Sequence, residues 1–225
     1  MKNIKIVLTG FFILSVSVCH MAQTVNWNAL EQSNHFVALG VGWDYGLTYS
    51  VAYGYQLNSA IPLMLNGQVS IPSGELLLDD YKLKAGAQVV LLNQSHWKGA
   101  LSLQGIYRRY GNPLVRLQNF GSEMKGTLGY YHDKWFFAGE LGFDKAIVAH
   151  FEHSDIYKEN ILQTVQDGWY EPATGGHFLY GVQTGWSFRR SDISLSIGKV
   201  VTQDFKSTPL IPYYLSLAFS YRIGA

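Results

Sequence analysis

The densest group of residues that could do chemistry is His150, Glu152 and His153, followed directly by Ser154 and Asp155. Imidazole and carboxylate groups bind divalent cations, and hydrolases place a histidine beside a serine or an aspartate. On an extended strand, however, His150 and His153 point to opposite faces, and no zinc-site spacing is matched. We therefore assign no catalytic residue, no metal site and no cofactor from the sequence.

The same group lies in a long polar connection from Lys145 to Gly176, which also contains Trp169 and Tyr170. Long connections are where binding residues concentrate, and aromatic side chains often anchor a partner. We expect a short helix near Ser154 to Gln166, with Ser154 or Asp155 as its N-cap. The candidate binding residues for a protein or glycan partner are His150, Glu152, His153, Trp169 and Tyr170.

The elements that must position these residues are strands, and the last one, Ile211 to Ile223, has the most regular pattern. Its apolar residues share one parity, and its small or polar residues share the other. Its length matches a tilted strand that crosses a bilayer. Similar segments recur from residue 36 onward, and we count ten, with eight as the alternative.

The connections between these segments alternate in length. Four of them, reading LNSAI, NQSH, HDK and RRS, are short, and most of the others are longer, including Arg109 to Asn119 and Lys145 to Gly176. Even strand numbers, short periplasmic turns and longer external loops are typical of bacterial membrane barrels. The sequence therefore predicts an all-β, antiparallel transmembrane barrel with one long external loop that contains a short helix.

The two faces of the expected strands differ in chemistry. The apolar parity carries hardly a charge, and its aromatic residues gather near strand ends, where membrane interfaces favour amphipathic rings. The expected interface residues are Tyr55, Trp97, Tyr107, Tyr130, Trp135, Trp186, Phe188 and Tyr221. Gly, Ala, Ser and Thr dominate the other parity, which suits a narrow barrel interior.

Charges of both signs occur on the small-residue parity and should pair inside the barrel, because an unpaired buried charge is costly. The expected lumen charge network consists of Lys82, Lys84, Lys98, Arg108, Glu123, Lys125, Glu140, Asp144 and Arg222. This network either forms a salt-bridged plug, which is the interpretation we favour, or lines a path or binding site for a polar solute.

The N-terminal segment has the three parts of a secretory signal peptide: Lys2 and Lys5, an apolar run from Ile6 to Val18, and small Ala22. We expect cleavage near Ala22, which divides the chain into a signal peptide (1–22), a periplasmic lead-in (23–35) and the barrel (36–225). Cleavage removes the only cysteine and leaves 15 basic and 16 acidic residues. That balance argues against nucleic acid as a partner.

The signal peptide, the ten alternating segments and the final amphipathic strand resemble the small outer-membrane β-barrel proteins of Gram-negative bacteria. The Ala22-Gln23 junction and the tyrosine-rich strands resemble those of the Bacteroidetes branch. The resemblance implies a location in the outer membrane, with outer-membrane lipid and the barrel assembly machinery as partners. Such chains typically end on an aromatic residue, whereas Gly224 and Ala225 follow Ile223 here.

Two other functions are consistent with part of the pattern. A membrane-embedded hydrolase acting on lipid A or peptide would need a site at the external rim, and we find no motif of the omptin proteases around Asp79, Asp80, His153 and Asp155. A soluble lipocalin-like periplasmic barrel would turn its apolar parity inward. The main prediction is a non-enzymatic barrel with a structural, surface-binding or small-solute role.

Overall fold

The protein is a β-barrel with two short helices in the described parts of the chain. The computed structural model describes residues 24–30, 34–43, 46–74, 79–172 and 175–224. The strands are β1 (His35–Trp43), β2 (Leu47–Leu57), β3 (Leu63–Pro72), β4 (Asp80–Gln94), β5 (Trp97–Gly111), β6 (Val115–Tyr131), β7 (Trp135–His153), β8 (Gly168–Tyr170), β9 (Gly176–Ser187), β10 (Ser191–Thr202) and β11 (Tyr213–Ile223). The helices are α2 (Trp27–Leu30) and α3 (Asp155–Asn160).

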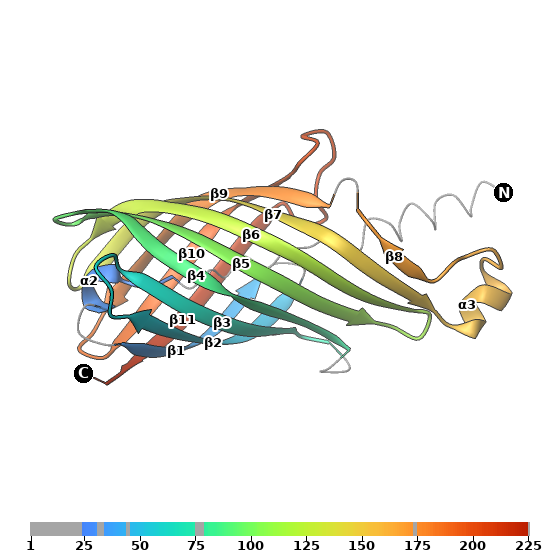
Figure 1. The fold of residues 1–225 in the computed structure, drawn as a ribbon, viewed down its shortest axis with the longest axis horizontal. Coiled ribbons are helices and arrows are strands. Elements are labelled where there is room, and N and C mark those ends of the chain that lie inside the picture. Colours follow the sequence, from blue (N-terminus) through green and yellow to red (C-terminus); the bar gives the residue numbers. More distant parts are fainter. Residues whose placement is uncertain (1–23, 31–33, 44–45, 75–78, 173–174, 225) are drawn as a thin grey trace.

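Ten of the strands close into an antiparallel barrel (Figure 1). Strand β1 pairs with β2 on one side and with β11 on the other, as expected for the last strand. Strand β11 also pairs with β10, and β6 pairs with β7. Strand β8 pairs only with β7 and lies outside the ring of ten. The predicted ten-strand antiparallel barrel is therefore confirmed.

Alternation along the strands separates an apolar outside from a small or polar inside. On β2, Tyr49 and Val51 are 53% and 54% exposed, whereas Thr48 and Ser50 between them are buried. Successive Cβ atoms point to opposite faces of a strand, so this sequence pattern becomes two chemically different surfaces. A lipocalin-like barrel would have the reverse orientation.

The two ends of the barrel differ, and we name them after their helices (Figure 1). At the α2 end, strands are joined by residues 58–62, 95–96, 132–134 and 188–190. At the α3 end, the longest connection, 154–175, contains α3 and β8. The expected short connections therefore all lie at the α2 end, beside the C-terminal strand end.

One expected loop is wrong. Residues 109–119 were expected to form a polar loop, but β5 continues to Gly111 and β6 begins at Val115, which leaves 112–114 as the turn. The Asn112 side chain accepts hydrogen bonds from the backbone of Leu114 and Val115 and so closes this turn. Polar residues extend these strands because the strands run on beyond the apolar band.

The long connection is also shorter than expected, because β7 continues through Lys145 to His153. The register of β6 and β7 shifts between Phe120 and Gly121, which leaves Ile147 without a partner on β6. Such a bulge exchanges the two faces of the strand. The helix is confirmed with Ser154 as its N-cap, but it ends at Asn160 rather than near Gln166.

The expected signal peptide (1–22) lies outside the described residues. Residues 24–30 of the expected lead-in lie inside the α2 end of the barrel (Figure 1). None of the helices in the described part of the chain is long and apolar enough to cross a membrane.

Candidate functional site

The centre of the lumen is organised around the carboxylate of Glu140 on β7. Lys125 Nζ on β6 lies 2.8 Å from Glu140 Oε2, and the Tyr214 hydroxyl donates to Glu140 Oε1. Gln183 donates a longer hydrogen bond of 3.4 Å to Oε2. The side chains of Lys125 and Glu140 are 3% and 0% exposed. Because water does not reach these two charges, each one is stabilised by the other.

A second buried ion pair lies beside it. Lys84 Nζ on β4 is 2.7 Å from Glu123 Oε2 on β6, with side chains 3% and 0% exposed. Close by in the strand register, Gln104 donates to Asn66 Oδ1 over 2.8 Å. Together with the first pair, these contacts fill the middle of the lumen with ion pairs and hydrogen bonds.

Toward the α3 end the lumen residues pair again. Arg108 Nη2 lies 3.0 Å from Asp80 Oδ2. His177 Nδ1 lies 3.4 Å from Asp144 Oδ1, and the backbone N–H of His177 donates to the same oxygen. Lys82 is buried and faces inward here. Asp80 therefore has a structural partner.

At the α2 end, residues 24–30 form a plug, which we define as this segment including α2. Val25, Trp27 and Leu30 of the plug are 3%, 5% and 2% exposed. They pack inside the barrel in one cluster with wall residues Phe36, Met64, Val90, Tyr131, Phe136 and Ala138. The plug closes this end of the lumen with an apolar layer.

Polar contacts hold the plug to the rim. Asn26 donates to the carbonyl of His132 over 2.8 Å and to Ser187 Oγ over 2.9 Å, and Asn28 donates to the carbonyl of Tyr131 over 2.7 Å. Asn26 is fully buried. These bonds join the plug to two backbone carbonyls and one hydroxyl at the ends of the wall strands.

Arg222 and Lys98 also belong to this end. The Arg222 guanidinium donates to the carbonyls of Ala29 and Phe188 and lies 3.5 Å from Asp192 Oδ1. Lys98 is 3% exposed. A small cavity is lined by Val25 and Trp27 of the plug and by the Lys125 and Gln183 side chains of the wall.

Beyond the barrel, the longest strands form a projecting sheet, which we define as residues 108–111, 115–119, 149–153 and 168–170 (Figure 1). His150 pairs with Trp169 in the register, and their rings are 4.8 Å apart. On the same side Glu152 Oε2 lies 3.0 Å from Arg116 Nη1. After the bulge, Ala149 and Phe151 face the other way, as does Tyr170, which meets Phe151 edge-on at 5.7 Å.

His153 has a different partner from the one a metal site would need. Its Nδ1 lies 2.8 Å from Asp167 Oδ1, and its backbone N–H donates to the same oxygen. Lys158 Nζ lies 2.6 Å from Asp167 Oδ2. The Lys158 hydrogen bond, followed by those from His153, holds the pKa of Asp167 well below its usual value. These contacts fasten α3 to the sheet.

The five candidate binding residues therefore share one sheet but not one site. His150, Glu152 and Trp169 lie on its outward side, whereas His153 lies on the other face. The described residues contain no group of three or more His, Cys, Asp or Glu side chains that could hold a metal ion. In the register Asp80 is three strand steps from Phe151, roughly 14 Å at ~4.8 Å per step. An omptin-like pairing of Asp80 with His153 is thus not formed.

Two aromatic rings encircle the outside of the barrel. The α2-end ring consists of Trp97, Tyr130, Trp135, Trp186 and Tyr221, and the α3-end ring consists of Tyr81, Tyr107, Phe120, Phe178 and Tyr213. Tyr130 and Phe120 are ten positions apart on β6. At ~3.4 Å per residue and a tilt of ~40°, they are about 26 Å apart along the barrel axis.

Three features were not expected from the sequence: the plug, the projecting sheet and the part of Tyr214 in the central network. Alternation predicts whether a residue faces the lumen or the outside of the barrel. It does not predict which long side chains meet across the lumen. The WNAL run of the plug carries one tryptophan and one leucine and shows no strand alternation. An apolar pair in an otherwise polar lead-in was the available signal.

The fold and its surface define the class: a closed ten-strand antiparallel barrel with an apolar exterior and a charged, filled interior. No family model and no curated protein matches the sequence. Solved structures described as "KdgM porin" and "NanC porin structure in rhombohedral crystal form" are similar at 8% and 6% identity. Their TM-scores are 0.45 and 0.39, covering 84% of this chain and 99% and 100% of theirs.

Proposed function

We propose that this protein is an outer-membrane β-barrel. The support is its exterior, where side chains such as Leu103, Leu141 and Leu217 are 62%, 64% and 46% exposed between the two aromatic rings. An apolar band of about 25 Å between aromatic girdles is the outer surface of a transmembrane barrel. The outer-membrane lipid and the barrel assembly machinery are the partners that this placement requires.

The orientation follows from the two ends. Short turns and both strand termini of the barrel lie at the α2 end, which we place in the periplasm. The α3 end, with the projecting sheet, then faces the outside. On β6 the sheet runs five residues past Phe120, which is roughly 13 Å beyond the membrane interface at the same rise and tilt.

Within the membrane placement, we favour a surface-binding role over chemistry or conduction. Two features together support this choice: the lumen is filled, and a sheet projects beyond the barrel. The lumen is closed by the plug and by the Lys84–Glu123 and Lys125–Glu140 pairs. The sheet presents Trp169 at 58% and Tyr170 at 44% exposure, and such rings can anchor an extracellular protein or glycan.

Fractionation and a heat-modifiability gel test the placement. We expect the protein in outer membranes, with a different mobility when it is not boiled, and recovery as a soluble periplasmic protein would overturn the proposal. In planar bilayers the full chain should show no steady conductance. Binding of intact cells to glycan and protein arrays should then fall on changing Trp169→Ala but not on changing the lipid-facing Trp186→Ala.

A regulated passage for a small polar solute is the second candidate. It is favoured by the plug, which is a separate short segment inside the lumen, bonded to the barrel through Asn26, Asn28 and Arg222. Deleting residues 24–30 should then produce conductance that the full chain lacks. A Thr24→Cys, Ser196→Cys pair, whose hydroxyls lie 3.1 Å apart, should abolish solute passage when oxidised and restore it when reduced. Silent recordings from both variants would contradict a passage.

A further inference from the structure

Two lysines interrupt the apolar exterior, both near the α3 end. Among the described residues, the Asp, Glu, Lys or Arg side chains at outward-facing strand positions from one aromatic ring to the other are Lys145 on β7, Lys199 on β10 and Arg109 on β5, which pairs with Tyr81 in the register. Lys145 and Lys199 are exposed, and neither lysine side chain has a hydrogen bond or ion pair with any described residue. This part of the surface is therefore cationic without an internal counter-ion.

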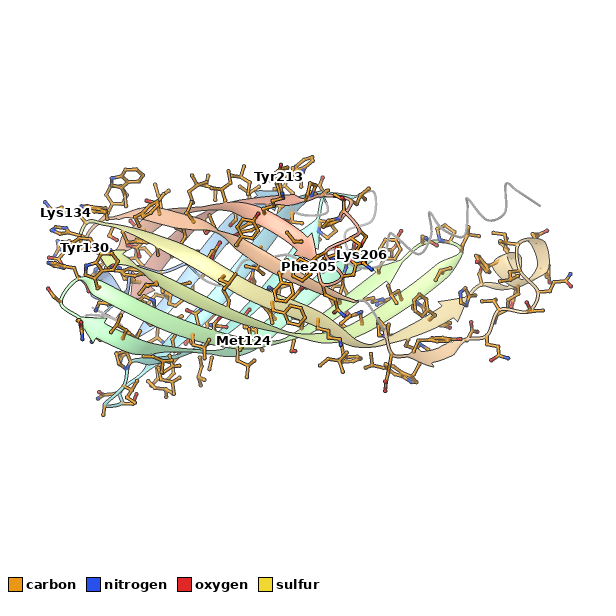
Figure 2. All side chains as sticks on the ribbon, turned by 90° about the horizontal axis from the view of Figure 1, so that it is seen from above. Met124, Tyr130, Lys134, Phe205, Lys206 and Tyr213 are labelled. Carbon is orange, nitrogen blue, oxygen red and sulfur yellow. The ribbon has the colours of Figure 1, made fainter. Side chains whose placement is uncertain are left out.

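An aromatic cluster lies between these two lysines. Phe143 on β7 and Phe178 on β9 have ring centroids 4.7 Å apart. Phe205, from the connection between β10 and β11, stacks on Phe178 at 5.3 Å and 20°. Figure 2 shows Phe205 beside Lys206, far along the barrel from Tyr130 and Lys134. The cluster thus lies at the end of the barrel that we place at the outer leaflet.

The connection holds Phe205 in this position by its own hydrogen bonds. Phe205 has φ of +54°, a conformation that non-glycine residues rarely adopt. The Asp204 carboxylate accepts from Thr202 Oγ1 over 2.7 Å and from the backbone N–H groups of Lys206 and Ser207. These bonds lower the pKa of Asp204. The Asp204 carboxylate therefore stabilises the turn. The Lys206 ammonium forms no ion pair with this carboxylate and is exposed beside the cluster.

The spacing of the two strand lysines suits a lipid headgroup. In the register Lys145 pairs with Gly176 and Lys199 with Tyr180, so the two lysines are two strand steps and four residues apart. At ~4.8 Å per step and ~3.4 Å per residue, their Cα atoms are roughly 17 Å apart. Long ammonium side chains at a membrane interface extend to headgroup level, where phosphate is the complementary anion.

We propose that Lys145, Lys199 and Lys206 bind the phosphate of an outer-leaflet lipid whose acyl chain packs on Phe143, Phe178 and Phe205. This proposal rests on the proposed location in the outer membrane, and it assigns one class of lipid to this part of the surface. The phosphate belongs to the lipid rather than to a free ion, because the lysines surround an apolar cluster on a surface that faces hydrocarbon.

The test uses the full chain in nanodiscs of phosphatidylcholine with ten per cent lipid A as the phosphorylated probe. The readout is the lipid A that stays bound to the protein after transfer to detergent, measured by mass spectrometry. One lysine near an anionic surface changes affinity roughly fivefold, so Lys145→Met with Lys199→Met should lower retention about 25-fold. Lys134→Met, at the other end of the barrel, is the matched control and should retain lipid A normally.

Equal retention by the double variant and the parent would overturn the proposal, as would an equal loss in Lys134→Met. Competition by millimolar inorganic phosphate would instead identify a site for the free ion and contradict the lipid assignment. A heat-modifiability gel on every variant distinguishes failure of the membrane placement from failure of the lipid site. A chain that never inserts contradicts the membrane placement. An inserted barrel that does not retain lipid A contradicts the site alone.

Discussion

Tyr214 on β11 reaches across β9 and β10 to donate its hydroxyl hydrogen to Glu140 on β7. In the strand register, the row from Glu140 to Tyr214 passes through Gly181 and Gly198. A Cβ atom at either glycine would overlap the Tyr214 hydroxyl. The two glycines thus leave room for one aromatic ring to lie against the inner wall and to meet the central carboxylate.

Neutralising Glu140 should destabilise the barrel strongly. The change Glu140→Gln leaves Lys125 as an uncompensated buried charge, and breaking a buried pair in this way costs about 3–5 kcal/mol. Urea unfolding in detergent micelles, followed by the gel shift between folded and unfolded forms, measures the loss. The matched control is Glu152→Gln in the exposed pair with Arg116, where about 0–1 kcal/mol is expected. Equal effects would contradict a paired lumen network.

Filling the space over the two glycines should break the contact between Tyr214 and Glu140. We expect Gly198→Ala to cost about 1–3 kcal/mol, because the added methyl group overlaps the backbone carbonyl oxygen of Tyr180 as well as the Tyr214 ring. The control Gly67→Ala faces outward, where the nearest atom is 3.9 Å from the new Cβ, and should be close to neutral. Adding Tyr214→Phe to each variant checks the mechanism: the hydroxyl deletion should cost less in Gly198→Ala than in the parent.

Removing the plug's aromatic ring should loosen the α2 end. Trp27→Ala empties a site in the buried cluster, and such a deletion typically costs about 3–5 kcal/mol. Limited proteolysis and hydrogen exchange of residues 24–30 should show faster opening than in the parent. Trp169→Ala, which removes a 58% exposed ring at the other end, should leave exchange in the plug unchanged.

Acid should release α3 from the projecting sheet. Hydrogen bonds from Lys158 and His153 lower the pKa of Asp167 below its ordinary 3.8, so the ionised carboxylate stabilises the folded loop. For a lowered carboxyl pKa, this contribution is complete above about pH 4 and declines as the pH falls through the folded-state pKa. Proteolysis of residues 154–170 with an acid-active protease should therefore accelerate toward pH 2. Asp167→Asn should be cleaved faster at neutral pH and depend less on pH, and an unchanged profile would contradict the assignment.

Alternation allowed most of the barrel to be predicted, because period-two patterning follows directly from strand geometry. It placed Ser216 and Ser220 inside, Leu215 and Leu217 outside, and β11 between β10 and β1. It failed beyond the apolar band, where both faces of a strand meet water and the pattern loses contrast. For that reason the sequence predicts a loop at residues 109–119, although only 112–114 form the turn and the others belong to β5 and β6.

The candidate site was less predictable. The inward face of Lys84 and Glu123 follows from parity, but their 2.7 Å contact depends on barrel tilt and stagger, which no single strand encodes. The bulge opposite Phe120 exchanged the faces of β7, which places His150 rather than His153 on the outward side of the sheet, although their opposite directions follow from the spacing alone. The plug was missed because its residues pack against many strands at once.

The plug also contacts the seam at which the barrel closes. Residues 24–30 lie four residues ahead of β1 in the sequence, and the pairing of β1 with β11 joins the first barrel strand to the last. Arg222 on the last strand donates to the carbonyl of Ala29 in the plug, so the plug contacts the strand that completes this seam. The seam and the buried Trp27 thus support each other at the α2 end. An affinity tag fused directly before Thr24 would have to fit inside the barrel, whereas a tag after Ile223 would not.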